Sequence, residues 1–208
     1  MKVLGIDTTR KRAKIFILNE DNEYVDNIND NIKHSEGLFL YLEKALLENK
    51  LELKDFDYFA GIVGPGSFTG IRVGMSVIKG FNQVFHKKII ALNAFEVLSE
   101  KIKNGVVLLH STNSTCYFAE IKNSKIADSG VIEKEQIKNK FDSEIYILQE
   151  EQSLLNISYN NLNIVENFDD LFFKALRKKI TDNNCDSFEP YYLQLSQAER
   201  NLNDKSEN

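Results

Sequence analysis

Six of the ten glycines lie between Gly61 and Gly80, and this cluster constrains the fold more than any other sequence feature. It follows a near-continuous apolar run over residues 58–63, which is typical of a strand covered on both faces. A helical apolar pattern then continues to about Phe85. Glycines at such a junction allow backbone conformations and close approaches that other residues prevent. The cluster therefore predicts a strand–turn–helix unit of an α/β layer protein.

The spacing of these glycines matches neither common phosphate-binding template. Gly61 and Gly66 have the Walker A spacing, but Ser67 stands where that motif needs its lysine. The spacing of Gly64, Gly66 and Gly70 is one residue too long for the dinucleotide fingerprint. Ser67 or Thr69 can cap the following helix, whose free N–H groups could hold an anion. The sequence leaves open a purely structural turn and an anion-binding or interface loop. The candidate residues of the loop are Gly64, Pro65, Gly66, Ser67, Phe68, Thr69, Gly70, Arg72 and Gly74.

Apolar periodicity divides the chain into two similar halves. In the first half it predicts strands over 2–6, 13–18, 23–26, 58–63 and 89–92, and helices over 35–50, 67–85 and 94–103. After Gly105 the pattern restarts, with strands over 106–109, 116–121, 126–127 and 145–148 and a helix over 168–179. We expect Ser35 to be the N-cap of the first helix. The sequence predicts an α/β fold of two lobes, 1–104 and a degenerate copy over 105–188, followed by a C-terminal segment over 189–208 whose last residues are frayed.

Charge and composition exclude several classes of protein. The net charge is −5. The first 104 residues contribute +1 and the remainder −6. The chain therefore lacks the positive charge that is typical of a protein that binds nucleic acid without a partner. No apolar stretch is long enough to span a membrane. The cysteines Cys116 and Cys185 match no metal or redox spacing, which favours a reduced cytoplasmic protein, and we interpret Cys116 as a small strand hydrophobe.

Few residues have the pattern of a catalytic centre. Asp7, Thr8 and Thr9 follow the first strand, where a carboxylate and hydroxyls could orient Mg²⁺ or phosphate. Sugar-kinase and actin-like proteins use D-x-G-[TS] here, and Thr9 replaces the glycine. The corresponding loop of the second half, over 110–115, has no Asp and no Gly. Two degraded phosphate loops argue against an independent ATPase, so we interpret residues 7–9 as a vestigial phosphate loop.

The predicted helix over residues 35–50 is more apolar than one buried face requires. Residues 38–42 are Leu-Phe-Leu-Tyr-Leu without a break, so no single stripe contains them. The helix is either sandwiched inside its own domain or exposes an apolar patch that a partner covers. The preceding His34 lacks a second histidine at position 38, so the metal-binding H-x-x-x-H pair is broken.

The stretch Gly64-Pro-Gly-Ser-Phe-Thr-Gly-Ile-Arg-Val-Gly74 resembles the TsaB (YeaZ) family. Ile6-Asp7-Thr8, His34-Ser-Glu and Tyr192-Leu-x-x-Ser-Gln-Ala-Glu-Arg200 extend the resemblance over 1–104 and the C-terminal segment. The resemblance implies a two-lobed actin, hexokinase and Hsp70-like (RNase H-like) fold. It also implies a role in forming N6-threonylcarbamoyladenosine (t6A) at position 37 of tRNAs that read codons beginning with A.

In that pathway the resemblance implies a non-catalytic subunit that pairs with TsaD. TsaC supplies threonylcarbamoyl-adenylate, TsaD transfers the carbamoyl group, and the ATPase TsaE joins them. The chain would have no cofactor of its own, would contact tRNA only through the complex and would form homodimers when alone. Whether ATP or ADP binds at the interface with TsaD stays open. The predicted interface residues are His34, Leu38, Tyr41, Leu42, Ala45, Ile71, Met75 and Ile78. A charge at Leu42 or Gly74 is expected to abolish pairing and leave the fold intact.

Two other classes of function remain as alternatives. The first is an enzyme of the same superfamily, either metallopeptidase-like (the glycoprotease family) or a small-molecule kinase. The second is a nucleic-acid-binding module that acts alone. The broken histidine pair, the degraded loops and the acidic charge count against them.

Overall fold

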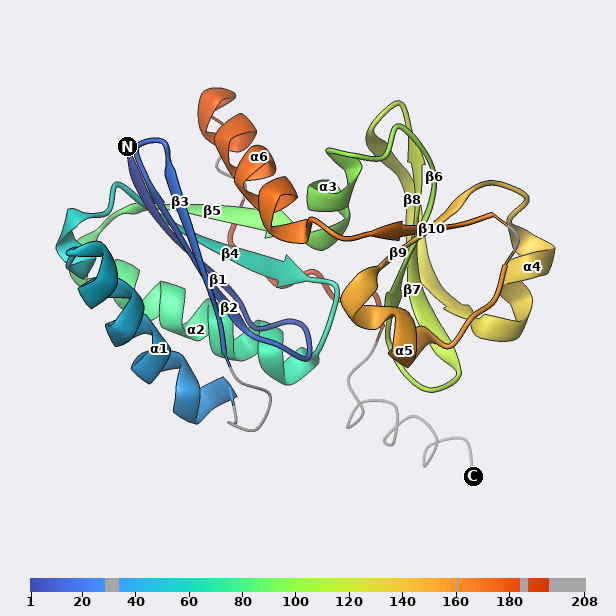
Figure 1. Cartoon of the computed structure of the whole chain (residues 1–208), viewed down its shortest axis with the longest axis horizontal. Helices are drawn as coiled ribbons and strands as arrows, with labels where there is room; N and C mark the ends of the chain where they lie inside the picture. Colours follow the sequence, from blue (N-terminus) through green and yellow to red (C-terminus); the bar gives the residue numbers. More distant parts are fainter. Residues whose placement is uncertain (29–33, 160, 184–186, 195–208) are drawn as a thin grey trace.

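The first half of the chain forms a five-stranded mixed sheet. The computed structural model describes residues 1–28, 34–159, 161–183 and 187–194, without the side chains of 34–36. The strands are β1 (Lys2–Asp7), β2 (Lys14–Asn19), β3 (Asn22–Asn27), β4 (Tyr58–Gly64) and β5 (Lys88–Asn93). Their order is β3-β2-β1-β4-β5, with β1 antiparallel to β2 and parallel to β4 (Figure 1). The five strands expected from apolar periodicity are therefore confirmed.

The second half repeats this topology. Its strands are β6 (Asn104–His110), β7 (Thr115–Lys122), β8 (Lys125–Glu133), β9 (Ile145–Leu148) and β10 (Leu162–Val165). They are ordered β10-β9-β6-β7-β8, with β6 antiparallel to β7 and parallel to β9. Each strand thus has a counterpart at the same place in the first sheet. The expected two-lobed fold is confirmed. We call the β1–β5 sheet with its helices the first lobe, and the β6–β10 sheet with its helices the second lobe.

Two long helices cover one face of the first sheet. They are α1 (His34–Asn49) and α2 (Phe68–Phe85). Leu4, Ile6, Ile15 and Ile17 of the sheet form one buried cluster with their apolar side chains. Since α1 begins at His34, Ser35 lies inside the helix, and its prediction as the N-cap is wrong. Ser67 is the N-cap of α2, as expected, because its side-chain oxygen accepts the N–H of Gly70 at 3.2 Å.

The opposite face of the first sheet carries α3 (Ala94–Ser99) and α6 (Phe168–Thr181) (Figure 1). Helix α3 ends four residues earlier than the expected limit of 103, because the chain must turn to enter β6 at Asn104. The remaining elements are short: η1 (Leu53–Asp55), η2 (Lys134–Gln136), α4 (Ile137–Lys140), η3 (Gln149–Glu151) and α5 (Gln152–Leu155). Among the described residues no helix is long and apolar enough to cross a membrane.

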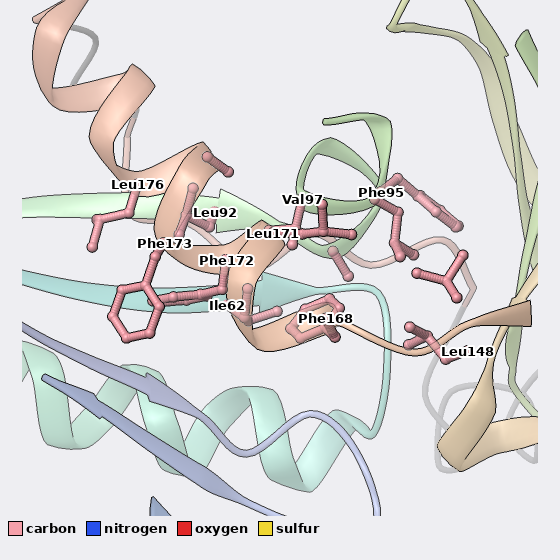
Figure 2. Close-up of a cluster of buried hydrophobic side chains, with 14 of the residues drawn as sticks. Ile62, Leu92, Phe95, Val97, Leu148, Phe168, Leu171, Phe172, Phe173 and Leu176 are labelled. Atoms are coloured by element: carbon pink, nitrogen blue, oxygen red, sulfur yellow. The ribbon is translucent and has the colours of Figure 1, made fainter. Parts of the chain in front are cut away.

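One apolar core joins the two lobes. Figure 2 shows Phe172 and Phe173 of α6 beside Ile62 of β4, with Leu148 of β9 at the other end of the cluster. The Phe172 ring stacks on Phe16 of β2 with centroids 3.9 Å apart. A Cβ at Gly5 would lie 2.7 Å from this ring, so β1 needs a glycine beneath it. Although α6 belongs to the predicted 105–188 segment, it packs against the first sheet.

Cys116 is buried in β7, which confirms its interpretation as a small strand hydrophobe. Burial raises the pKa of its thiol to about 11, so the thiolate is scarce at neutral pH. Cys185 lies outside the described residues.

Candidate functional site

The loop after β1 is closed by the chain's own donors. One oxygen of the Asp7 carboxylate accepts the backbone N–H and the hydroxyl of Thr9, at 2.9 and 2.6 Å. The other accepts Arg10 Nη1 at 3.0 Å. Asp7, Thr8, Thr9 and Arg10 are all buried. The carboxylate that could have oriented Mg²⁺ or phosphate is engaged within its own loop, which agrees with a vestigial phosphate loop.

Arg10 fills the space beside this carboxylate. Its guanidinium carbon lies 3.7 Å from the centroid of the Phe168 ring, within cation–π range. Its Nε lies 3.8 Å from Glu150 and 3.7 Å from Glu151. Within the described part of the chain, Arg10 Nη2 is buried and has no hydrogen-bond partner. Stacking on Phe168 and attraction to the nearby carboxylates therefore hold the guanidinium in place, although Nη2 makes no hydrogen bond.

The glycine motif is explained by close packing against this loop. A Cβ at Gly66 would lie 2.5 Å from the carbonyl oxygen of Thr9, and one at Gly70 only 1.9 Å from that of Thr8. A Cβ at Gly74 would lie 2.5 Å from Thr8 Oγ1. The backbone N–H of Ser67 donates to the Thr9 carbonyl at 2.8 Å. These contacts favour the structural interpretation of the motif, since side chains here would push the two loops apart.

The rest of the motif holds the C-terminal segment. A Cβ at Gly64 would lie 2.5 Å from the carbonyl oxygen of Tyr191. Phe68 stacks on Tyr192 with centroids 4.6 Å apart, and Arg72 Nε donates to the Tyr192 hydroxyl at 3.1 Å. Phe68 and Arg72 are thus engaged with the chain itself. Pro65 is buried, and Thr69 lies exposed in the first turn of α2.

A cleft of about 540 Å³ lies between the two lobes. Its walls include Thr9, Arg10, Gly66 and Ser67 of the first lobe, His110, Ser111, Thr112, Tyr117 and Glu151 of the second, and Gln194. Gln194 Nε2 donates to Ser111 Oγ and to the Tyr117 hydroxyl, at 2.9 and 2.7 Å. The two degraded loops therefore face each other across the cleft.

Three charged residues of this cleft were absent from the sequence-based candidates, namely Arg10, Lys11 and Glu151. Glu151 Oε2 accepts the backbone N–H of His110 at 2.7 Å. Burial raises the pKa of the Glu151 carboxyl to about 7, and the nearby Arg10 guanidinium opposes this shift. Burial also lowers the pKa of His110, and Lys134 adds to that effect. The only sequence signal for Arg10 was its position directly after Asp7-Thr8-Thr9.

The described residues hold no group of three or more His, Cys, Asp or Glu side chains that could bind a metal ion. The imidazole of His34 lies outside the described part of the structure, and Leu38 is buried in the core.

The predicted partner residues of α1 and α2 need a correction. Leu38, Leu42, Ala45, Ile71, Met75 and Ile78 are all buried in the core against the first sheet. Tyr41 is half-buried at its edge. Side chains that fill the core cannot also contact a partner. A charge at Leu42 or Gly74 would therefore disturb the fold, contrary to the expectation that it would leave the fold intact.

Helix α1 nevertheless exposes a second apolar face. Phe39, Leu40 and Leu47 are 55%, 61% and 72% exposed. With about 3.6 residues per turn, they form one stripe on the side of the helix away from Leu38 and Leu42. Val84 near the end of α2 is 69% exposed. We call Phe39, Leu40 and Leu47 the apolar face. Large exposed apolar side chains that gather on one helix indicate an interaction surface.

Sequence comparisons relate the chain to proteins of tRNA modification. A family model described as TsaD, tRNA N6-adenosine threonylcarbamoyltransferase, matches residues 30–148. A relative from Buchnera aphidicola subsp. Acyrthosiphon pisum is named tRNA threonylcarbamoyladenosine biosynthesis protein TsaB. It is 24% identical over 182 residues, which cover 80% of this chain and 81% of the relative. The tRNA N6-adenosine threonylcarbamoyltransferase of Rickettsia bellii is 27% identical over 143 residues, 58% of this chain and 42% of that protein.

Solved structures share the fold. YeaZ from Pseudomonas aeruginosa aligns with a TM-score of 0.69 at 16% identity, covering 92% of this chain and 99% of that one. A second P. aeruginosa structure, described as an uncharacterized protein with similarity to peptidase YEAZ, gives 0.70 at 15% identity, with coverage of 93% and 99%. The family model covers more than half of the chain, so this chain belongs to the TsaD family, and within that family it resembles the TsaB (YeaZ) proteins.

Proposed function

We propose that this chain is a subunit of the machinery that forms t6A on tRNA, and that it assists a TsaD-type transferase without catalysing the transfer. The biosynthetic role is supported by relatives named TsaB that align over most of the chain. The observation that carries the non-catalytic role is the closed loop after β1. There the Asp7 carboxylate accepts three donors of its own loop. A carboxylate engaged in this way is poorly placed to orient a metal ion or a phosphate.

The partner in this proposal is TsaD, which contacts the apolar face on α1. The stripe over Phe39, Leu40 and Leu47 is expensive to leave in water, at about 25 cal/mol per Å² of apolar surface. A transferase related to this chain can present a helix equivalent to α1. The two proteins would then pair through these helices, in the way that two identical copies pair through the same surface. Without TsaD, the same face would pair two copies of this chain. TsaE would join the pair, tRNA would contact it through TsaD, and a bound ATP or ADP would lie at the interface.

The first experiment mixes the purified chain with its cognate TsaD and follows complex formation by size-exclusion chromatography with light scattering. The expected result is a heterodimer peak that grows at the expense of the homodimer. Leu47→Glu is expected to abolish this peak, because it places a charge on the apolar face. Leu154→Glu is the matched control, since Leu154 is an exposed leucine of the second lobe. Equal loss of pairing in both variants would contradict the proposed surface.

A second experiment reconstitutes t6A formation from TsaC, TsaD, TsaE, ATP, threonine, bicarbonate and tRNA. Product is expected only when this chain is added, and it should fall with Leu47→Glu in step with pairing. Zinc binding or ATP hydrolysis by the isolated chain would instead favour the metallopeptidase-like or kinase alternative. A salt-dependent tRNA mobility shift with the isolated chain would favour a nucleic-acid-binding module.

A further inference from the structure

Two cations of the β1–β2 hairpin face carboxylates from the second half of the chain. Arg10 Nε lies 3.8 Å from Glu150 and 3.7 Å from Glu151, both in η3 of the second lobe. Lys14 Nζ lies 2.7 Å from Asp169, in the first turn of α6, and 3.5 Å from Glu150. Glu150 is shared by both cations. The hairpin of the first lobe is therefore joined by opposite charges to η3 and to the start of α6.

The two cations and Glu151 are shielded from solvent. The side chains of Arg10, Lys14 and Glu151 are 4%, 8% and 9% exposed, whereas Glu150 and Asp169 are about a third exposed. Attraction between shielded charges is screened little by salt. The guanidinium of Arg10 is also fixed on two other sides, by Asp7 Oδ2 at 3.0 Å and by the Phe168 ring at 3.7 Å. It cannot leave the two acids of η3 without breaking these contacts.

The contact continues into the second sheet through Glu151. Its Oε2 accepts the backbone N–H of His110, the last residue of β6, at 2.7 Å. β6 is the central strand of the second sheet. Arg10 and Lys14 are therefore connected, through η3, to the strand that carries the degraded loop of the second lobe.

We propose that Arg10 and Lys14 form an interlobe clamp that holds the two lobes in one relative arrangement without any bound ligand. In a two-lobed cleft protein, a ligand between the loops normally supplies contacts to both sides, and closure follows binding. Here Arg10 of the first loop and Lys14 of β2 supply such contacts in the free chain. The clamp is independent of the proposed role in tRNA modification, because it concerns the arrangement of the lobes and not the partner.

The test compares hydrogen exchange in the full-length chain and its variants by mass spectrometry. Glu150→Gln is the first variant, because Glu150 is shared by both cations and its loss leaves the buried Arg10–Asp7 pair intact. Exchange in residues 106–112 and 145–155 is expected to rise about tenfold, while residues 58–64 of the first sheet stay unchanged. Arg10→Gln should give a larger rise in the same segments, with a larger radius of gyration in small-angle X-ray scattering.

Lys44→Gln is the matched control, since Lys44 pairs with Asp26 and Glu48 inside the first lobe. It should leave exchange in 106–112 and 145–155 at the wild-type rate. Unchanged exchange in those segments for folded Glu150→Gln would overturn the clamp, as would an equal rise in Lys44→Gln. If Arg10→Gln fails to fold, Lys14→Gln replaces it, and the same segments decide the outcome.

Discussion

Gly70→Ala should destabilise the fold, because Gly70 makes the tightest contact of the glycine motif. A Cβ at this position would lie 1.9 Å from the carbonyl oxygen of Thr8, whereas real Cβ contacts stay beyond 3.0 Å. The loop must therefore move by about 1 Å. It is held in place because Thr8 Oγ1 donates to the Gly70 carbonyl at 2.6 Å and Ser67 N–H donates to the Thr9 carbonyl at 2.8 Å.

Overpacking of this kind costs about 1–3 kcal/mol, and the group that the added Cβ meets is a backbone carbonyl, so we take about 3 kcal/mol. Alanine in place of glycine inside a helix returns about 1 kcal/mol. The free energy of unfolding should therefore fall by about 2 kcal/mol, which corresponds to about 4–8 °C in Tm for a chain of this size.

Gly80→Ala is the matched control on the same helix. Nothing lies within 4 Å of a Cβ at Gly80, so only the gain in helix propensity remains. The free energy of unfolding should rise by about 1 kcal/mol, and Tm by about 2–4 °C. Urea and thermal unfolding followed by circular dichroism measure both variants. A Gly70→Ala protein as stable as wild type would refute the account of the motif as a close-packed loop junction.

Three further predictions follow from buried groups. The pKa of Glu151, about 7 in the fold against an ordinary value of 4.5, means that the native state binds this proton more tightly. The free energy of unfolding should therefore fall as pH rises from 4.5 to 7, by about 3 kcal/mol at most, and Glu151→Gln should remove that slope in urea titrations at pH 5 and 8. Leu42→Glu should give a largely unfolded protein by circular dichroism, whereas Leu47→Glu should keep the wild-type spectrum, because only Leu42 is buried. Phe172→Ala should lower the free energy of unfolding by about 3–5 kcal/mol, against about 0.5 kcal/mol or less for the exposed Phe39→Ala, and equal losses would contradict the stacked core.

Local pattern was sufficient to predict most of the fold. Alternating and continuous apolar runs predicted nine of the ten strands. A strand buried on one face has an apolar residue at every second position, and one buried on both faces is apolar throughout. β10, with only four residues, is too short to show a period. The end of α3 was misplaced for a different reason. Residues 100–103 continue a helical pattern, but the chain has to reach β6.

For helix α1 the sequence predicted an exposed apolar surface but not which residues form it. Its composition revealed more apolar surface than one face can bury, and that inference agrees with the exposed Phe39, Leu40 and Leu47. The choice of Leu38, Leu42 and Ala45 as contact residues placed the surface on the wrong side of the helix. Nothing in the helix itself tells which of two apolar faces meets the sheet, because both have the same period.

The sequence by itself determined the strand–turn–helix unit at the glycine cluster, the repetition of one topology in two lobes, and the resemblance to TsaB proteins. Each of these depends on residues close together in the chain. Only the tertiary structure decided that Arg10 closes the loop after β1, that Glu151 meets it from the second lobe, and that α6 covers the first sheet. The contact of Arg10 with Glu151 and that of Phe16 with Phe172 of α6 join residues more than a hundred positions apart, and a local pattern does not record which distant residues pack together.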